Sequence, residues 1–127
     1  MIVTHPAAVA VSCIKQWLKG TEFRRCHVAT KVPEGLDGSM VRVDYAPPVR
    51  ETTVTDRTRL MLQAYAGSDQ ECLELLSEAL DGMDNAYLHH PTVLDWQTDE
   101  APYEFPDPDR EDTFRWQAAG TLWTTIE

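Results

Sequence analysis

One segment constrains the fold of this chain most strongly. Residues 59–66, which read RLMLQAYA, carry apolar side chains on both faces that an extended strand would present. Successive side chains of a strand point in opposite directions, so Leu60 and Leu62 share one face while Met61 and Tyr65 share the other. Because neither face suits contact with water, the segment is predicted to be a central strand of a sheet.

Two helices are predicted, one before this strand and one after it. Residues 6–19 begin with a proline, which suits a first helical turn, and precede Gly20, which suits the position just past a helix end. Apolar residues recur there at three- and four-residue spacing, which indicates one buried stripe. Ser68 with Glu71 three positions later is a capping-box pattern, and it predicts a second helix over residues 69–80.

Four more strands complete the predicted element list. They are expected at residues 23–30, 40–46, 93–97 and 113–126. In the last of these, Gly120 marks either a bulge or a close backbone approach. The order of one helix, three strands, one helix and two strands indicates an α+β fold with a mostly antiparallel sheet of about five strands and two helices packed on one face. With 127 residues, the chain is expected to form one domain over residues 1–127.

An acidic, proline-punctuated segment precedes the last predicted strand. Residues 99–112 (DEAPYEFPDPDRED) hold seven acidic residues and one arginine, and so carry six of the chain's ten net negative charges. The three prolines restrict backbone φ there and bias the preceding residues toward extended conformations. The segment is therefore expected to be a stiff, exposed arm that suits binding to another protein.

The start of the chain is basic. Residues 1–31 contain five lysines and arginines against one glutamate, a local balance of +4. Complementary patches on one molecule can meet between copies in a head-to-tail arrangement, which closes into a ring if the rotation allows it. The candidate interface residues are Lys15, Lys19, Arg24, Arg25, Asp99, Glu100, Glu104, Asp107, Asp109, Glu111, Asp112 and Arg115. The alternative interpretation is that both patches are solvated faces without a partner.

Composition and motifs argue against several function classes. A net charge of -10 disfavours non-specific nucleic-acid binding, which depends on lysine and arginine neutralising phosphates. The three cysteines lack CxxC spacing and are interpreted as small buried side chains in a reducing compartment. The sequence has no run of about 18 apolar residues and no basic leader, so neither a membrane span nor a signal peptide is expected.

Catalytic and metal-binding patterns are absent from the sequence. There is no Gly-rich phosphate loop, no GxSxG and no HExxH. His89 and His90, with His5 and His27, are the only set that resembles a metal site. Adjacent histidines on a strand would point to opposite faces, so the pair does not suit one ion. We therefore expect no cofactor, no metal and no enzymatic activity.

The order of elements and two segments, DRTRLMLQAYAGSDQECLELL and PYEFPDPDREDTFRW, resemble tail terminator proteins of long-tailed phages of actinobacteria. The resemblance covers nearly the whole chain. Its motifs are the Pro106-Asp107-Pro108 turn and the Arg115-Trp116 pair at the start of the last strand. The sequence departs from the family pattern at APPVRETT, which lacks the usual glycine pair before the central strand.

The resemblance implies a structural virion protein. It would form a homo-hexameric ring at the head-proximal end of the tail tube, stop tube polymerisation, and provide the surface that joins the head. Its partners would be the tail tube protein, a head-connector or neck protein, and genomic DNA that passes through the lumen without specific binding. It would lie in the virion and, before assembly, in the host cytoplasm, with no membrane contact.

Three alternatives remain open at this point. The first is another phage neck protein, such as a head-closure or connector-stopper protein. The second is an acidic protein that binds and inhibits a cellular partner. The third is a small hydrolase or metalloenzyme that uses His89 or His90.

Overall fold

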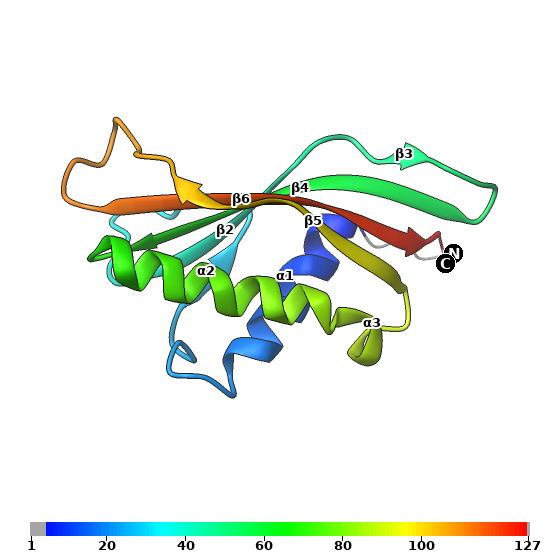
Figure 1. The fold of residues 1–127 in the computed structure, drawn as a ribbon, viewed down its shortest axis with the longest axis horizontal. Coiled ribbons are helices and arrows are strands. Elements are labelled where there is room, and N and C mark those ends of the chain that lie inside the picture. The colour runs from blue at the N-terminus through cyan, green and yellow to red at the C-terminus, as the bar shows by residue number, and fades with distance from the viewer. Residues whose placement is uncertain (1–4, 127) are drawn as a thin grey trace.

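The computed structural model describes residues 5–126, and within them a twisted sheet carries all of its helices on one face (Figure 1). The elements are α1 (Pro6–Leu18), β1 (His27–Ala29), β2 (Met40–Tyr45), β3 (Val49–Arg50), β4 (Thr55–Ala66), α2 (Asp69–Asp84), α3 (Ala86–His89), β5 (Val93–Glu104) and β6 (Phe114–Thr125). The strand order is β1-β2-β4-β6-β5, and β3 pairs with the start of β4. Only β1 and β2 are parallel among these pairs. The predicted α+β class is confirmed, with six strands and three helices in the described chain.

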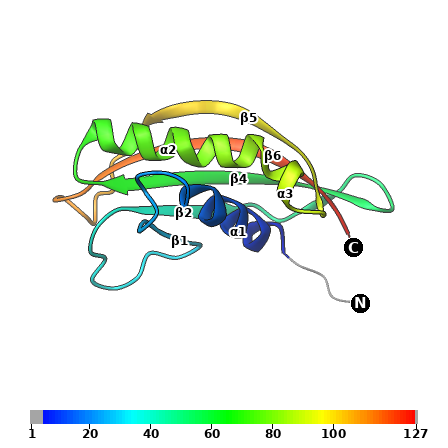
Figure 2. The same ribbon diagram turned by 90° about the horizontal axis from the view of Figure 1, so that it is seen from below.

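Residues 59–66 lie within β4, and their predicted central position in the sheet is confirmed. β4 pairs with β2 on one side and with β6 along its whole length on the other. Leu60 and Leu62 are fully buried toward the helices, and Tyr65 is buried on the opposite face. Figure 2 shows α1 and α2 side by side over the sheet, so the main apolar core lies between these helices and β2, β4 and β6.

Both predicted helices form, and their ends follow local chemistry. Ser68 Oγ accepts a hydrogen bond from the Glu71 backbone N–H at 3.1 Å, which confirms the predicted cap of α2. α2 then continues to Asp84 instead of ending at residue 80. Gly82 lies inside it because a Cβ at that position would come within 3.0 Å of the Trp17 Cβ, so glycine allows α1 and α2 to approach closely.

The predicted strand at residues 23–30 shortens to β1. After α1, Thr21 Oγ1 donates to the Leu18 carbonyl at 2.8 Å and accepts from the Phe23 N–H at 3.0 Å. These bonds hold residues 20–25 in turns, and Phe23 is buried there against the core. Residues before His27 therefore form turns and not the strand that their apolar pattern predicted.

The acidic segment is not a loop throughout, which corrects the prediction for residues 99–112. β5 runs from Val93 to Glu104, so residues 99–104 are strand paired with β6. The pairing contains three register shifts, and these break the alternation by which a strand is recognised in sequence. The predicted close approach at Gly120 is confirmed, because an added Cβ would overlap the Gln97 carbonyl oxygen and the Trp96 ring.

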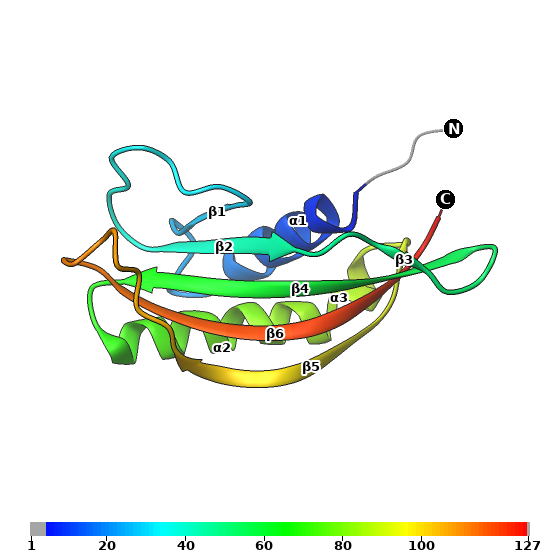
Figure 3. The same cartoon turned by 90° about the horizontal axis from the view of Figure 1, so that it is seen from above.

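A hairpin formed by β3 and the start of β4 extends beyond the rest of the sheet (Figure 3). Residues 47–54 are all exposed, and their sequence has no apolar alternation from which a strand could be predicted. Ion pairs of Arg50 with Asp56 at 2.8 Å and of Arg57 with Glu51 at 3.7 Å link the two arms of this hairpin.

Candidate functional site

The part of the acidic segment that remains a loop, residues 105–113, is here named the arm loop. It follows β5 and rises at one end of the sheet on the side away from the helices (Figure 1). Arg115, at the start of β6, holds it in place. Arg115 Nε donates to the Phe105 carbonyl at 2.6 Å, Nη2 donates to the Pro106 carbonyl at 3.2 Å, and Nη1 donates to Tyr65 Oη at 3.2 Å. Its guanidinium also stacks 4.5 Å from the centre of the Phe105 ring.

Asp107 completes this anchor. Its Oδ2 lies 3.7 Å from Arg115 Nη1 and 3.9 Å from Arg110 Nε, and its Oδ1 accepts the Asp109 N–H at 3.0 Å. The side chains of Arg115 and Asp107 are only 11% and 13% exposed. Both are among the predicted interface residues. In the structure, Asp107 lies within the arm loop and Arg115 lies at the start of β6, and together they organise the conformation of the loop.

Two further predicted interface residues are engaged on β5. Asp99 accepts hydrogen bonds from Gln97 Nε2 at 3.0 Å and from Thr121 Oγ1 at 2.7 Å. Glu100 forms an ion pair with Arg59 of β4. The other carboxylates of the segment are exposed and form no ion pair within residues 5–126: Glu104, Asp109, Glu111 and Asp112.

A cavity of about 330 Å³, here named the acidic groove, lies between the arm loop and the start of α2. Its lining includes the carboxylates of Asp69, Glu104 and Glu111 and the apolar side chains of Pro106 and Phe114. Asp69 Oδ1 accepts a hydrogen bond from Trp116 Nε1 at 2.9 Å, which fixes the carboxylate at the helix start. Asp107, Arg110 and Arg115 line it as well, so the groove combines an excess of negative charge with an apolar wall.

The basic residues at the start of the chain form a second exposed surface. Lys15 lies near the end of α1, Lys19 caps that helix, and Arg24 and Arg25 lie in the turns that follow. All four side chains are exposed, and none pairs with a carboxylate of the described chain. The surface formed by Lys15, Lys19, Arg24 and Arg25 is named the basic front.

The basic front and the arm loop are not brought together within one molecule. α1 lies on the helix side of the sheet, whereas the arm loop rises on the other side (Figure 1). Arg25 has a different environment from the lysines, because it lines a cavity of about 670 Å³ together with four carboxylates. Those carboxylates are Glu22, Asp37, Glu71 and Glu74.

The helix-free face of the sheet carries a polar network that sequence reasoning missed. Gln63 Nε2 donates to Gln117 Oε1 at 2.7 Å, and Gln117 Nε2 donates to Tyr103 Oη. Arg42 Nη1 donates to Gln63 Oε1 at 3.4 Å. The only signal in the sequence was a single glutamine within each of two long strands, and it does not reveal that the strands are neighbours.

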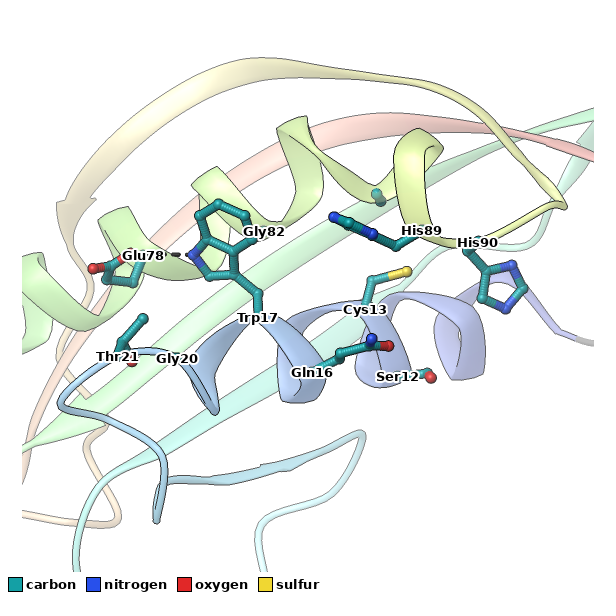
Figure 4. Close-up of a pocket in the computed structure, with 11 residues that line it drawn as sticks. Ser12, Cys13, Gln16, Trp17, Gly20, Thr21, Glu78, Gly82, His89 and His90 are labelled. Carbon is teal, nitrogen blue, oxygen red and sulfur yellow. Dashed lines mark hydrogen bonds between the residues drawn. The ribbon is translucent and has the colours of Figure 1, made fainter.

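A mainly apolar cavity of about 470 Å³ lies between α1, α2 and α3 (Figure 4). Trp17 Nε1 donates to Glu78 Oε1 at 3.1 Å on one side of it, and Cys13, His89 and His90 lie on the other (Figure 4). His89 ends α3 and His90 caps it, so the two histidines lie at a helix end and not on a strand.

Chemical activation is lacking at the thiols. Burial raises the pKa of the Cys13 thiol, and burial also raises the pKa of Cys72 to about 11. Both thiols are therefore protonated at neutral pH, whereas a nucleophilic cysteine needs a lowered pKa. Across residues 5–126, no cluster of three or more His, Cys, Asp or Glu side chains is arranged to hold a metal ion.

Two further findings bear on the class of protein. None of the helices in residues 5–126 combines the length and the apolar character needed to cross a membrane. A comparison of the chain with protein-family models and with curated proteins gave no match.

Proposed function

We propose that this protein is a structural virion component that forms a ring at the head-proximal end of a phage tail tube. The observation that carries the proposal is the presence of two exposed surfaces of opposite charge on different sides of one small domain. Such surfaces favour heterologous contacts between copies, and heterologous contacts form a ring where the rotation between neighbours closes. The resemblance to tail terminator proteins is the reason for assigning such a ring to the phage tail.

In this role the ring is a homo-hexamer that ends tube polymerisation and provides the surface for head joining. One face would contact the tail tube protein and the other a head-connector or neck protein. Genomic DNA would pass through the lumen without specific binding, because the net charge of -10 opposes attraction of phosphates. The mature location is the virion.

The competing proposal is an acidic protein that binds and inhibits a cellular partner. It is favoured by the excess of exposed carboxylates, since α2 alone carries six acidic residues and no basic one. An inhibitor of this kind needs no self-association. Its mass in solution should therefore be that of a monomer or dimer at every concentration.

The test is the light-scattering mass over a concentration series, with negative-stain imaging of the heaviest species. We expect a mass that rises with concentration to six copies, together with six-fold rings in the images. The association should weaken at high salt, because exposed charges are screened beyond about 10 Å at 0.1 M ionic strength. A mass that stays at one or two copies would contradict a self-assembling ring and favour the inhibitor.

A further inference from the structure

We propose that the acidic groove receives the side chains of Lys15 and Lys19 from a second copy of the chain. This inference rests on the proposed function and deepens it, because it assigns the contact through which neighbouring subunits would join. The contact is heterologous: each copy offers its groove to one neighbour and its lysines to the other.

The lining of the groove suits a long cationic side chain. Asp69, Glu104 and Glu111 contribute carboxylates that form no ion pair within residues 5–126. Arg110 and Arg115 also line the groove, and both direct their guanidinium groups to Asp107. Four carboxylates against two arginines leave the lining with an excess of two negative charges.

The apolar part of the groove suits contact with the aliphatic carbons of such a side chain. Phe114 is 43% exposed, which is high for a phenylalanine at the start of a central strand, and Pro106 lies in the same lining. A lysine side chain buries its aliphatic stem on apolar surface while it keeps its ammonium group near polar partners. The groove offers both surfaces within a single cavity.

Lys15 and Lys19 are the cations that fit this groove best. They lie four residues apart at the end of α1, so their side chains share one helical face. Like charges at this spacing disfavour a helix, and a facing pair of carboxylates would remove that cost. Arg25 is the weaker candidate because four carboxylates of its own chain line the same cavity.

Lys15 and Lys19 do not occupy the groove of their own chain, so the proposed contact requires a second copy. The end of α1 lies on the helix side of the sheet, and the arm loop rises at one end on the opposite side (Figure 1). No ion pair among the described residues connects Lys15 or Lys19 to the groove. The anchor built by Arg115 holds the arm loop in a fixed conformation, so the groove is formed before a partner arrives.

The first experiment is zero-length carbodiimide coupling in an equal mixture of ¹⁴N- and ¹⁵N-labelled protein, read by mass spectrometry. We expect amide cross-links from Lys15 or Lys19 to Glu104, Glu111 or Asp69, with the two peptides carrying different isotopes. Rings that form without these cross-links would overturn the contact and leave the proposed function intact. Cross-linked dimers that never form rings would support the contact and contradict the ring.

The second experiment is a charge exchange. Lys15→Glu with Lys19→Glu, and separately Glu104→Lys with Glu111→Lys, should each weaken self-association at least about tenfold, because like charges then face each other. The variant that carries all four reversals should regain association to within about threefold of the unmodified chain. Loss in both pairs without recovery in the combined variant would overturn the pairing.

A matched control separates local contact from net charge. Asp81→Lys with Asp84→Lys reverses two exposed carboxylates on α2 that line neither the groove nor the cavity of Arg25, and changes the net charge as much as the Glu104 and Glu111 reversals do. We expect this variant to associate like the unmodified chain. Equal weakening by the control would show that total charge governs association, and would overturn the assigned contact. Circular dichroism melts of each variant establish that the fold is retained.

Discussion

The positive charges of this molecule divide into two regions that differ in how they are balanced. The six arginines from residue 42 onward each form an ion pair, and they lie along the sheet, its hairpin and the arm loop. The five lysines and arginines before residue 32 form none with any described residue, and they lie at the end of α1 and in the segment that follows. The positive charges along the sheet are thus paired within the fold, whereas those at the end of α1 and just after it form no ion pair with a described residue.

The acidic segment, residues 99–112, also divides into carboxylates that have partners and carboxylates that do not. Asp99, Glu100 and Asp107 have partners within the fold, and Glu104 and Glu111 do not. A reversal at Asp107 would therefore disturb the arm loop itself. Tests of binding should use Glu104, Asp109 and Glu111 instead, because the fold does not depend on their charges.

The largest expected effect contrasts the two faces of β4. Leu62→Ala removes a fully buried side chain from the core between sheet and helices, and should lower the free energy of unfolding by about 3 kcal/mol. Met61→Ala changes the neighbouring residue on the helix-free face, where burial is partial, and should cost about 1 kcal/mol. Urea denaturation at a concentration below self-association measures both. Equal losses would show that the helix-free face is packed as tightly as the core.

The next effect contrasts two arginines on that helix-free side. Arg115→Ala removes hydrogen bonds to two carbonyl groups and leaves Asp107 with a weaker partner, and should cost about 2 kcal/mol. Arg57→Ala removes an exposed pair at 3.7 Å and should cost at most about 0.5 kcal/mol. Amide hydrogen exchange should also accelerate in residues 105–113 for Arg115→Ala alone. Unchanged exchange there would contradict the role of Arg115 as the anchor of the arm loop.

A smaller effect is expected at the start of α2. Ser68→Ala removes the acceptor for the Glu71 N–H and should lower the free energy of unfolding by about 1 kcal/mol. Ser68→Asp retains an acceptor and should preserve most of the stability. The comparison is made by thermal unfolding, and a loss of the same size in both variants would exclude the cap as its cause.

The smallest effect on stability is expected in the basic front. Lys15→Gln with Lys19→Gln removes two charges that have no ion-pair partner in residues 5–126, so the free energy of unfolding should change by no more than about 0.5 kcal/mol. Self-association should weaken in the same variant. Urea denaturation and light scattering measure the two quantities, and a large loss of stability would place these lysines among the residues that support the fold.

The sequence predicted those parts of the fold that depend on neighbouring residues. The apolar pattern around Leu60 identified the central strand, and Ser68 identified the start of α2. It did not predict that β5 continues to residue 104, because the register shifts opposite β6 interrupt the alternation. It also missed β3 and α3, which are short and expose most of their residues.

For the candidate site, the sequence indicated which residues are charged but not which charges are balanced. The pairing of Glu100 with Arg59 joins residues 41 positions apart, and it exists only because both β4 and β5 flank β6. The anchor at Arg115 likewise depends on the arm loop folding back onto the first residues of β6.

By itself the sequence determined the types of the long elements, the buried faces of α1 and α2 and the overall separation of basic and acidic segments. Only the tertiary structure decided that Asp99, Glu100 and Asp107 have partners while Glu104 and Glu111 line a groove. The physical reason is the separation along the chain over which each effect acts. Periodicity and capping act within a few residues, whereas an ion pair requires two side chains within about 4 Å, and that distance is set by strands that meet from distant parts of the chain.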